Sequence, residues 1–171
     1  MLMTRCAKAV MVACLALFAA LVAFNNLVDY RANLAFVQHV LAMDDIFEGS
    51  RHLIRWRAID SAWLWHVLYG LIIAGELVTA LLLGRGAWAL WRARRAPAAQ
   101  FARAKHWAMA GVLAGFVLWF LGFMVIGGEW FLMWQSPSWN GQESAFRFYI
   151  TLLAVGIFVN QGDGELPSEP G

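Results

Sequence analysis

Four long apolar stretches constrain the fold of this chain more than any other feature. Each approaches the roughly 20 residues that an α-helix needs to cross about 30 Å of hydrocarbon. The chain is 61% hydrophobic and 14% charged, which leaves more apolar surface than a water-soluble domain of 171 residues can bury. We therefore predict an all-α polytopic membrane protein, built as a four-helix transmembrane bundle. The predicted spans are residues 7–27, 62–83, 107–126 and 145–159.

The first and fourth spans depart from the simplest pattern. The first follows Arg5 and Lys8 as a secretory signal would, but its apolar run, residues 9–24, exceeds the roughly 7–15 residues of a signal core. We interpret it as an uncleaved transmembrane helix. The fourth span is short and begins beside Arg147, whose long side chain can reach the interface from within the membrane.

The segments outside the spans are polar. Residues 28–61 predict either an amphipathic helix on the outer membrane surface or a partly buried loop helix. Three of their apolar residues recur at helical spacing: Leu34, Val37 and Leu41. Residues 161–171 are rich in Gly, Pro and acidic residues, so we predict a disordered tail after a single domain, residues 1–160.

Basic residues near the helix ends predict the orientation in the membrane. Eight lie in the N-terminal segment and residues 84–106, against five in residues 28–61 and 127–147. We therefore predict that both termini and the 84–106 segment are cytoplasmic. The formal net charge is only +2, which provides no general basic field for nucleic acid.

Small residues on two spans predict where helices approach closely, because close backbone contact drives helix association in lipid. They form one stripe on the first span and one on the third: Ala9, Ala13, Ala16, Ala20 and Ala23, and then Ala108, Gly111, Gly115 and Gly122. We interpret both stripes as seams within the bundle. The alternative is that one of them forms a homodimer interface.

Glu76 lies near the middle of the second span, where an ionisable group is costly and is by default a functional-site hypothesis. Counting residues from the cytoplasmic edge brings no Lys or Arg to its depth, and the predicted hydrogen-bond partners are Thr79 and Thr151. Glu76 could hold helices together, relay protons or ions, or contact a partner subunit.

A stripe of residues on the second span includes Glu76. His66, Tyr69 and Ile73 precede it at spacings of three, four and three, which places all four on one helical face. The stripe could line a polar pathway from the outer face. Its outer half could equally be chance, because His and Tyr are both common at the membrane interface.

Polar residues also gather at the predicted outer ends of the spans: Asn25, Asn26, Asp29, Glu129 and Arg147. Glu129 and Arg147 flank the same loop, and we predict a salt bridge between them. The loop itself, residues 127–142, contains Trp130, Trp134 and Asn140 and has turn signals at residues 136–137 and 140–141. We predict a cap that binds a small ligand or quinone-like headgroup, or one that only anchors the chain at the interface.

Motifs for metal or cofactor binding are absent from the sequence. Cys6 and Cys14 are eight residues apart on one helix, too far for a disulfide. Haem ligation by two histidines would need both at one depth in the membrane. Only the pairs His39–His66 and His52–His66 could meet this condition. No cofactor or metal is therefore predicted.

Several segments resemble a known family. They are residues 24–30 (FNNLVDY), 36–44 (FVQHVLAMD), 127–136 (GGEWFLMWQS), 139–142 (WNGQ) and 145–148 (AFRF). Together they resemble a bacterial family known only as predicted small integral membrane proteins of unknown function. The resemblance extends to about residue 159. It implies four spans in the cytoplasmic (inner) membrane and assigns no activity, cofactor or catalytic residue.

Three classes of function follow from these features. The small-residue seams, the aromatic cap and the lack of a catalytic constellation favour a non-enzymatic accessory or binding subunit, with a membrane protein or a second copy as partner. A small transporter or proton-linked carrier using Glu76 is the second class. A quinone- or haem-linked redox protein is the third.

Overall fold

The computed structural model describes residues 1–166, and every regular element in this part of the chain is helical. In chain order the elements are α1 (Leu2–Val28), α2 (Tyr30–Ala42), α3 (Glu48–Ile54), η1 (Arg55–Arg57), α4 (Ala62–Ala93), α5 (Ala98–Ala104), α6 (His106–Phe116), η2 (Val117–Trp130), η3 (Met133–Gln135) and α7 (Gln142–Asn160).

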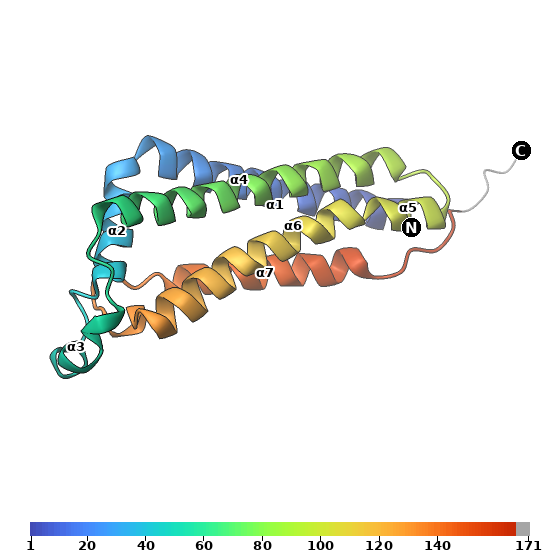
Figure 1. Ribbon diagram of the computed structural model, residues 1–171. Helices are drawn as coiled ribbons and strands as arrows, with labels where there is room; N and C mark the ends of the chain where they lie inside the picture. The colour runs from blue at the N-terminus through green and yellow to red at the C-terminus, as the bar shows by residue number, and fades with distance from the viewer. Residues whose placement is uncertain (167–171) are drawn as a thin grey trace, which may run out of the picture.

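Four helical segments are long and apolar enough to cross a membrane. They are α1, α4, α7 and the continuous segment Ala98–Trp130, which comprises α5, α6 and the π-helical η2. Figure 1 shows them side by side in an elongated bundle, with α2 and α3 at one end and the N-terminus and α5 at the other. We call these the cap end and the basic end. The predicted all-α polytopic membrane fold with four spans is confirmed.

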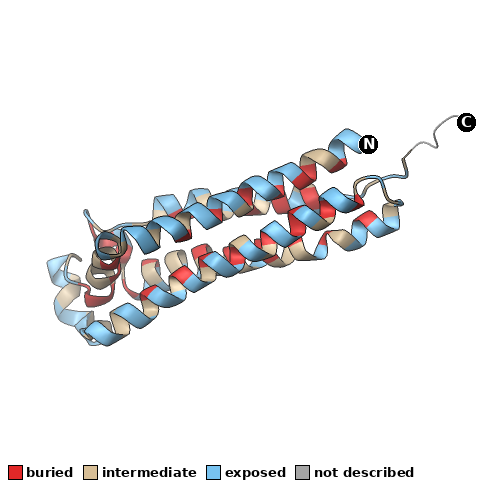
Figure 2. Ribbon diagram, turned by 90° about the horizontal axis from the view of Figure 1, so that it is seen from above, coloured by how far each residue is buried: buried red, intermediate tan, exposed pale blue. Residues whose placement is uncertain are grey.

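The bundle surface is apolar, as expected for helices surrounded by lipid. Each of the four spans exposes a large aliphatic side chain for more than 60% of its area: Leu17, Leu81, Leu113 and Ile157. Figure 2 shows buried residues along the inward faces of the helices and exposed residues along the outward faces. Lipid contact therefore accounts for apolar residues that a soluble bundle would place inside.

The buried face of α1 differs from the predicted alanine stripe. Ala9, Ala19 and Ala23 are buried, but Ala13 and Ala20 are exposed. The seam continues instead through larger residues, Val12 and Leu15. Counting only small residues identified the wrong face over the middle of the helix, because the contact with α4 there uses branched side chains.

The stripe on the third span packs inside the bundle over most of its length. Ala108, Gly111 and Gly115 are buried. A Cβ at Gly111 would lie 2.8 Å from the backbone nitrogen of Leu83 on α4, so glycine permits α4 and α6 to approach closely. Gly122 differs, since a Cβ there would meet no atom within 4 Å.

The helices extend beyond the predicted spans. α4 continues ten residues past residue 83 to Ala93, and much of the basic segment 84–106 is helical. α4 ends at Ala93, and a short turn leads to Pro97, which disfavours helical geometry in the residue before it. α5 begins directly after Pro97.

The loop helix α2 is partly buried rather than laid on the membrane surface. Leu34, Val37 and Leu41 are each 7% exposed, and they pack in one cluster with Tyr69 and Phe131. The helical periodicity predicted this helix, and its apolar face is covered by α4 and the cap.

Candidate functional site

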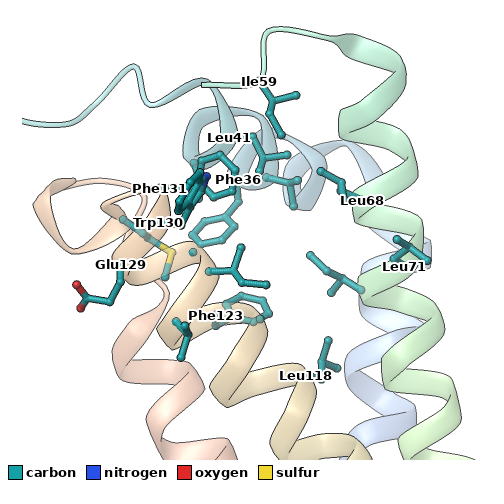
Figure 3. Close-up of a pocket in the computed structure, with 18 residues that line it drawn as sticks. Phe36, Leu41, Ile59, Leu68, Leu71, Leu118, Phe123, Glu129, Trp130 and Phe131 are labelled. Atoms are coloured by element: carbon teal, nitrogen blue, oxygen red, sulfur yellow. The ribbon is translucent and has the colours of Figure 1, made fainter. Parts of the chain in front are cut away.

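A cavity of about 770 Å³ lies between α4 and η2 beneath α2. Figure 3 shows its lining side chains projecting into this space from the three helices and from the chain around residue 130. Large apolar side chains form most of the wall: Val37, Leu41, Leu68, Leu71, Ile72, Leu118, Phe123, Ile126, Trp130 and Phe131. Leu71 and Trp130 are also exposed on the bundle surface, so the cavity opens sideways as a cleft.

The cleft arises where two spans diverge. α4 packs closely on α6 through Gly86, Gly111 and Gly115, but large side chains on both helices separate α4 from η2. Gly122 adds to the open space because it has no side chain. Among residues 1–166, Glu129 is the only ionisable residue that lines the cleft, and its carboxylate points away from the cavity (Figure 3).

The predicted cap is tied to the turn after α2. Ser136 Oγ donates to Asp45 Oδ2 at 2.6 Å, and the backbone nitrogen of Ser138 donates to the same oxygen at 3.3 Å. The hydrogen bond from Ser136 lowers the pKa of Asp45, although partial desolvation opposes the shift. Gln135 Oε1 accepts from the backbone nitrogen of Phe47 at 3.2 Å. Sequence analysis did not single out Asp45, because it lies in a turn without a recognisable motif.

Other predicted cap residues have structural contacts. Trp134 stacks edge-on against Phe47 with ring centroids 5.9 Å apart. Asn140 Oδ1 accepts from the backbone nitrogen of Gln142 at 3.1 Å, which fits a residue that starts a helix. Of the cap residues Trp130, Trp134 and Asn140, which were predicted to bind a ligand, Trp130 alone lines the cleft.

The structure corrects the predicted salt bridge between Glu129 and Arg147. Arg147 pairs with Glu143 one turn earlier on α7. The pairing follows from helical spacing, since residues four apart on a helix are neighbours. Glu129 forms no ion pair with the residues that the structure describes, and Asn25 and Asp29 are exposed at the end of α1.

Glu76 is 2% exposed, and its partner is Asn26 rather than a threonine. Asn26 Nδ2 donates to both carboxylate oxygens at 2.8 and 2.9 Å. Thr79 and Thr151, the predicted partners, donate to backbone oxygens of their own helices. The error came from counting depth from residue 83, because α4 extends to Ala93 and shifts its pairing with α1 toward the cap end.

Polar groups lead from Glu76 to the cap end. Tyr69 Oη donates to the backbone oxygen of Asn26 at 2.8 Å, and the Tyr69 and Tyr30 ring centroids are 4.8 Å apart. Tyr30 Oη lies 2.8 Å from His66 Nδ1. The structure therefore brings His66, Tyr69 and Glu76 to one side of α4, with Ile73 buried between them.

The histidines considered for haem lie in separate environments. His39 stacks on Trp139 with ring centroids 4.3 Å apart and lies 2.9 Å from Asp44, whereas His66 contacts Tyr30 and His52 is exposed. Within residues 1–166 no group of three or more His, Cys, Asp or Glu side chains could hold a metal ion.

Comparison with known families agrees with this architecture. A family model described as "Predicted small integral membrane protein (DUF2165)" matches residues 4–162. The chain belongs to this family. The resemblance seen in the sequence motifs is thus confirmed. No curated protein and no solved structure matches the chain.

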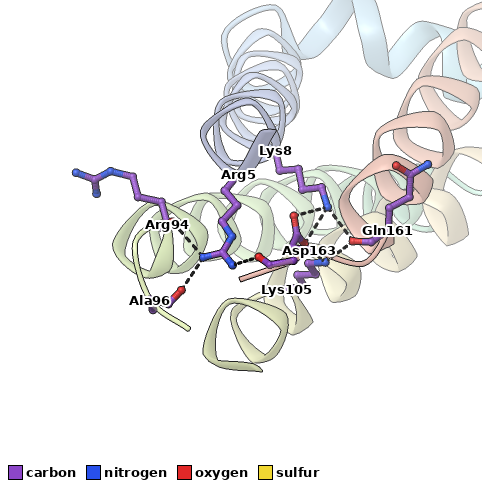
Figure 4. Close-up of polar contacts among 8 residues, drawn as sticks. Arg5, Lys8, Arg94, Ala96, Lys105, Gln161 and Asp163 are labelled. Atoms are coloured by element: carbon purple, nitrogen blue, oxygen red, sulfur yellow. Dashed lines mark hydrogen bonds and ion pairs between the residues drawn. The ribbon is translucent and has the colours of Figure 1, made fainter. Parts of the chain in front are cut away.

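This DUF2165 protein also has a buried charge cluster at its basic end, which sequence analysis missed (Figure 4). Lys8 Nζ lies 2.9 Å and Lys105 Nζ 2.5 Å from the carboxylate of Asp163, and both lysines also donate to the backbone oxygen of Gln161. Lys8 is 1% and Lys105 7% exposed. Gln161 and Asp163, in the predicted disordered tail 161–171, therefore contact the bundle, and residues 167–171 lie outside the described residues.

Arg5 fixes the same tail to the α4–α5 connection. It is fully buried and donates to the backbone oxygens of Ala96 at 2.6 Å and Gly164 at 2.8 Å. Its guanidinium carbon lies 4.9 Å from the ring centroid of Phe101. Three chain segments thus meet at one arginine, which gives the cluster a structural role.

Replacing Glu76 tests whether its contact with Asn26 holds α1 to α4. Glu76→Ala should reduce stability by about 1–3 kcal/mol, because it leaves the half-buried amide without its acceptor. Glu76→Gln keeps an acceptor oxygen and should remain close to the wild type. Unfolding of the detergent-solubilised protein would measure both.

Asn26→Ala supplies the control for this contact. The double variant with Glu76→Ala should be destabilised by less than the sum of the two single variants, because the residues form one interaction. Strict additivity would show that the two side chains do not interact.

Proposed function

We propose that this protein is a membrane-embedded binding protein that holds one apolar chain of a membrane lipid in the cleft between α4 and η2. The observation that supports this proposal is the cleft itself. Its volume of about 770 Å³ falls within the roughly 300–1,000 Å³ of typical small-molecule sites. Its wall is apolar and its opening faces the lipid side of the bundle.

The character of the wall favours a flexible chain over a partner helix. Helices associate in lipid through small residues that permit close backbone approach. The cleft is lined mainly by Leu, Ile, Val and Phe, with Gly122 and Gly127 as its two glycines. Such a surface is better suited to a thin, flexible hydrocarbon chain. The sequence favours a non-enzymatic accessory or binding role, and we propose that this role is the binding of a lipid.

The geometry gives less support to a proton-linked carrier. The polar groups reach Glu76 from the cap end, whereas toward the basic end the next buried residues on α4 are Thr79, Leu83 and Gly86. The Thr79 hydroxyl is bonded to its own helix at Gly75. Described polar side chains therefore lead to Glu76 from one side, as expected for a contact that holds helices together.

For location, we propose the cytoplasmic (inner) membrane of a bacterium, with the basic end inside. The excess of basic residues near that end supports this orientation. The cleft then opens in the outer half of the membrane, with the cap in the outer headgroup region.

Filling the cleft at Gly122 tests the proposed function. Gly122→Phe places an aromatic ring in the open space, and no neighbouring atom lies within 4 Å of its Cβ position. Gly70→Phe is the matched control, because Gly70 is exposed on α4 and also has no atom within 4 Å. The probe is a phosphatidylcholine with a photoactivatable diazirine on one acyl chain, reconstituted with the protein in phosphatidylcholine vesicles.

Peptide mapping of the labelled protein should show labelling concentrated on cleft residues of α4 and η2. Gly122→Phe should reduce that labelling about tenfold, because an overfilled site rejects added volume, while Gly70→Phe should leave it unchanged. Uniform labelling around the bundle, or equal labelling in both variants, would contradict the proposal. Affinity purification from native membranes provides a second test. If a membrane protein copurified stoichiometrically with the wild type and with Gly70→Phe but not with Gly122→Phe, the cleft would bind a helix and the proposal would be contradicted.

A further inference from the structure

We propose that the lipid held in the cleft carries an anionic headgroup, phosphate in class, and that Arg57 binds this headgroup at the mouth of the cleft. The proposal rests on the proposed function and names the class of ligand. It assigns a binding role to an arginine that pairs with no acidic side chain among the described residues.

Arg57 lies directly on a wall residue of the cleft. Its guanidinium carbon is 5.0 Å from the ring centroid of Trp130 and 5.4 Å from that of Trp56. Trp130 lines the cleft, as does Ile59, two residues after Arg57. A cation therefore stacks on an exposed residue at the edge of the cleft.

The hydrogen-bonding capacity of Arg57 is largely unused. Its Nη1 reaches the backbone oxygen of Trp130 only at 3.5 Å, and its Nε is buried without a hydrogen-bond partner. No acidic side chain pairs with it among the described residues, although Arg55 in the same η1 turn lies 3.7 Å from Asp60. A guanidinium presents a planar fork of donors that matches two oxygens of a phosphate.

The surroundings of Arg57 favour a lipid headgroup over a free anion. Tryptophans gather at membrane interfaces, and six lie at this end of the bundle: Trp56, Trp63, Trp65, Trp130, Trp134 and Trp139. Arg57 lies at the same end. The carboxylate of Glu129 points away from the cavity (Figure 3). The guanidinium of Arg57 and the apolar cleft are therefore adjacent, as are the anionic headgroup and the apolar chain of a lipid.

Two photoactivatable lipids with the same diazirine chain test the proposal. One is a phosphatidylglycerol and the other a phosphatidylcholine, each added at low fraction to phosphatidylcholine vesicles containing the full chain. Cleft labelling by the phosphatidylglycerol should exceed that by the phosphatidylcholine about tenfold in the wild type, because both lipids carry a phosphate but only the phosphatidylcholine adds a quaternary cation that Arg57 repels. Arg57→Gln should bring the ratio close to one.

Arg55→Gln is the matched control, because it removes an equal charge from the same turn and should preserve the ratio. Cleft labelling of Arg57→Gln by the phosphatidylcholine shows that this variant is folded. A ratio near one in the wild type, or an equal fall in both variants, would overturn the headgroup assignment while leaving chain binding intact. Absence of cleft labelling by either lipid would instead overturn the proposed function. Excess free glycerol phosphate should not compete, and full competition would show that the site binds the anion alone.

Discussion

Replacing Asp163 with alanine should destabilise the protein by about 3 kcal/mol, the lower end of the range for breaking a buried ion pair. The substitution leaves Lys8 and Lys105 facing each other with no counter-charge from Asp163, while Arg5 lies on the same buried face of α1. The cost of uncompensated buried charge exceeds that of the lost hydrogen bonds. Unfolding in mixed micelles would measure the loss.

Glu165→Ala provides the comparison. Glu165 is also an acid of the tail, but it is exposed and accepts only from the backbone nitrogen of Ala98. Its removal should change stability by less than about 0.5 kcal/mol. Equal effects at the two positions would indicate that the tail acts through overall charge rather than through the buried cluster.

The same cluster predicts how stability depends on pH. Burial acts to raise the pKa of Asp163, but hydrogen bonds from Lys105 and Lys8 outweigh it and hold the pKa below the ordinary value of 3.8. A carboxyl group with a depressed pKa contributes stability above its unfolded pKa and loses it as the pH falls through the folded value. The wild type should therefore lose this contribution below about pH 4, and Asp163→Ala should show a smaller acid loss.

This cluster shows where composition misleads. A segment rich in Gly, Pro and acidic residues favours disorder, yet Arg5, Lys8 and Lys105 bind residues 161, 163 and 164 of this segment. A usable signal was present, since Arg5 and Lys8 are three residues apart on the face of α1 that also carries Val12. Cations on a buried face require acceptors. Arg5 and Lys8 were used only to predict the orientation in the membrane, so the acceptors that these buried cations need were not predicted.

The spans and the loop helix were predictable because the bilayer imposes them. An apolar run of sufficient length has few alternatives to a helix, and helical periodicity in α2 marks the face that packs on α4. The position of Glu76 was also evident, because ionisable residues within spans are rare. Its partner was not, since pairing between helices depends on where each helix ends, and α4 continues to Ala93.

The cleft could not be predicted from the sequence. Its wall consists mainly of Leu, Ile, Val and Phe, the same residues that fill a bundle core. Whether they enclose a core or leave a space depends on the separation of α4 and η2, which is set by the close contact of α4 with α6. The glycines that create this contact are therefore part of what positions the cleft.

Gly86 provides the sharpest test of that contact. A Cβ at Gly86 would lie 2.5 Å from the backbone nitrogen and 2.6 Å from the Cα of Ala108, so Gly86→Ala must push α6 away from α4. We expect a loss of about 3 kcal/mol or more in unfolding free energy, at the upper end for overpacked cores. Helix propensity alone would have favoured alanine by about 1 kcal/mol.

Gly84→Ala is the control within the same helix, because a Cβ there would meet no atom within 4 Å. It should leave stability unchanged or raise it by up to about 1 kcal/mol. Adding Ala108→Gly to Gly86→Ala should restore little, since the closest atoms belong to the backbone of Ala108 and remain after its methyl group is removed. Full recovery of stability in that double variant would mean that the methyl group of Ala108 keeps the helices apart. This result would contradict the close backbone approach of α4 and α6.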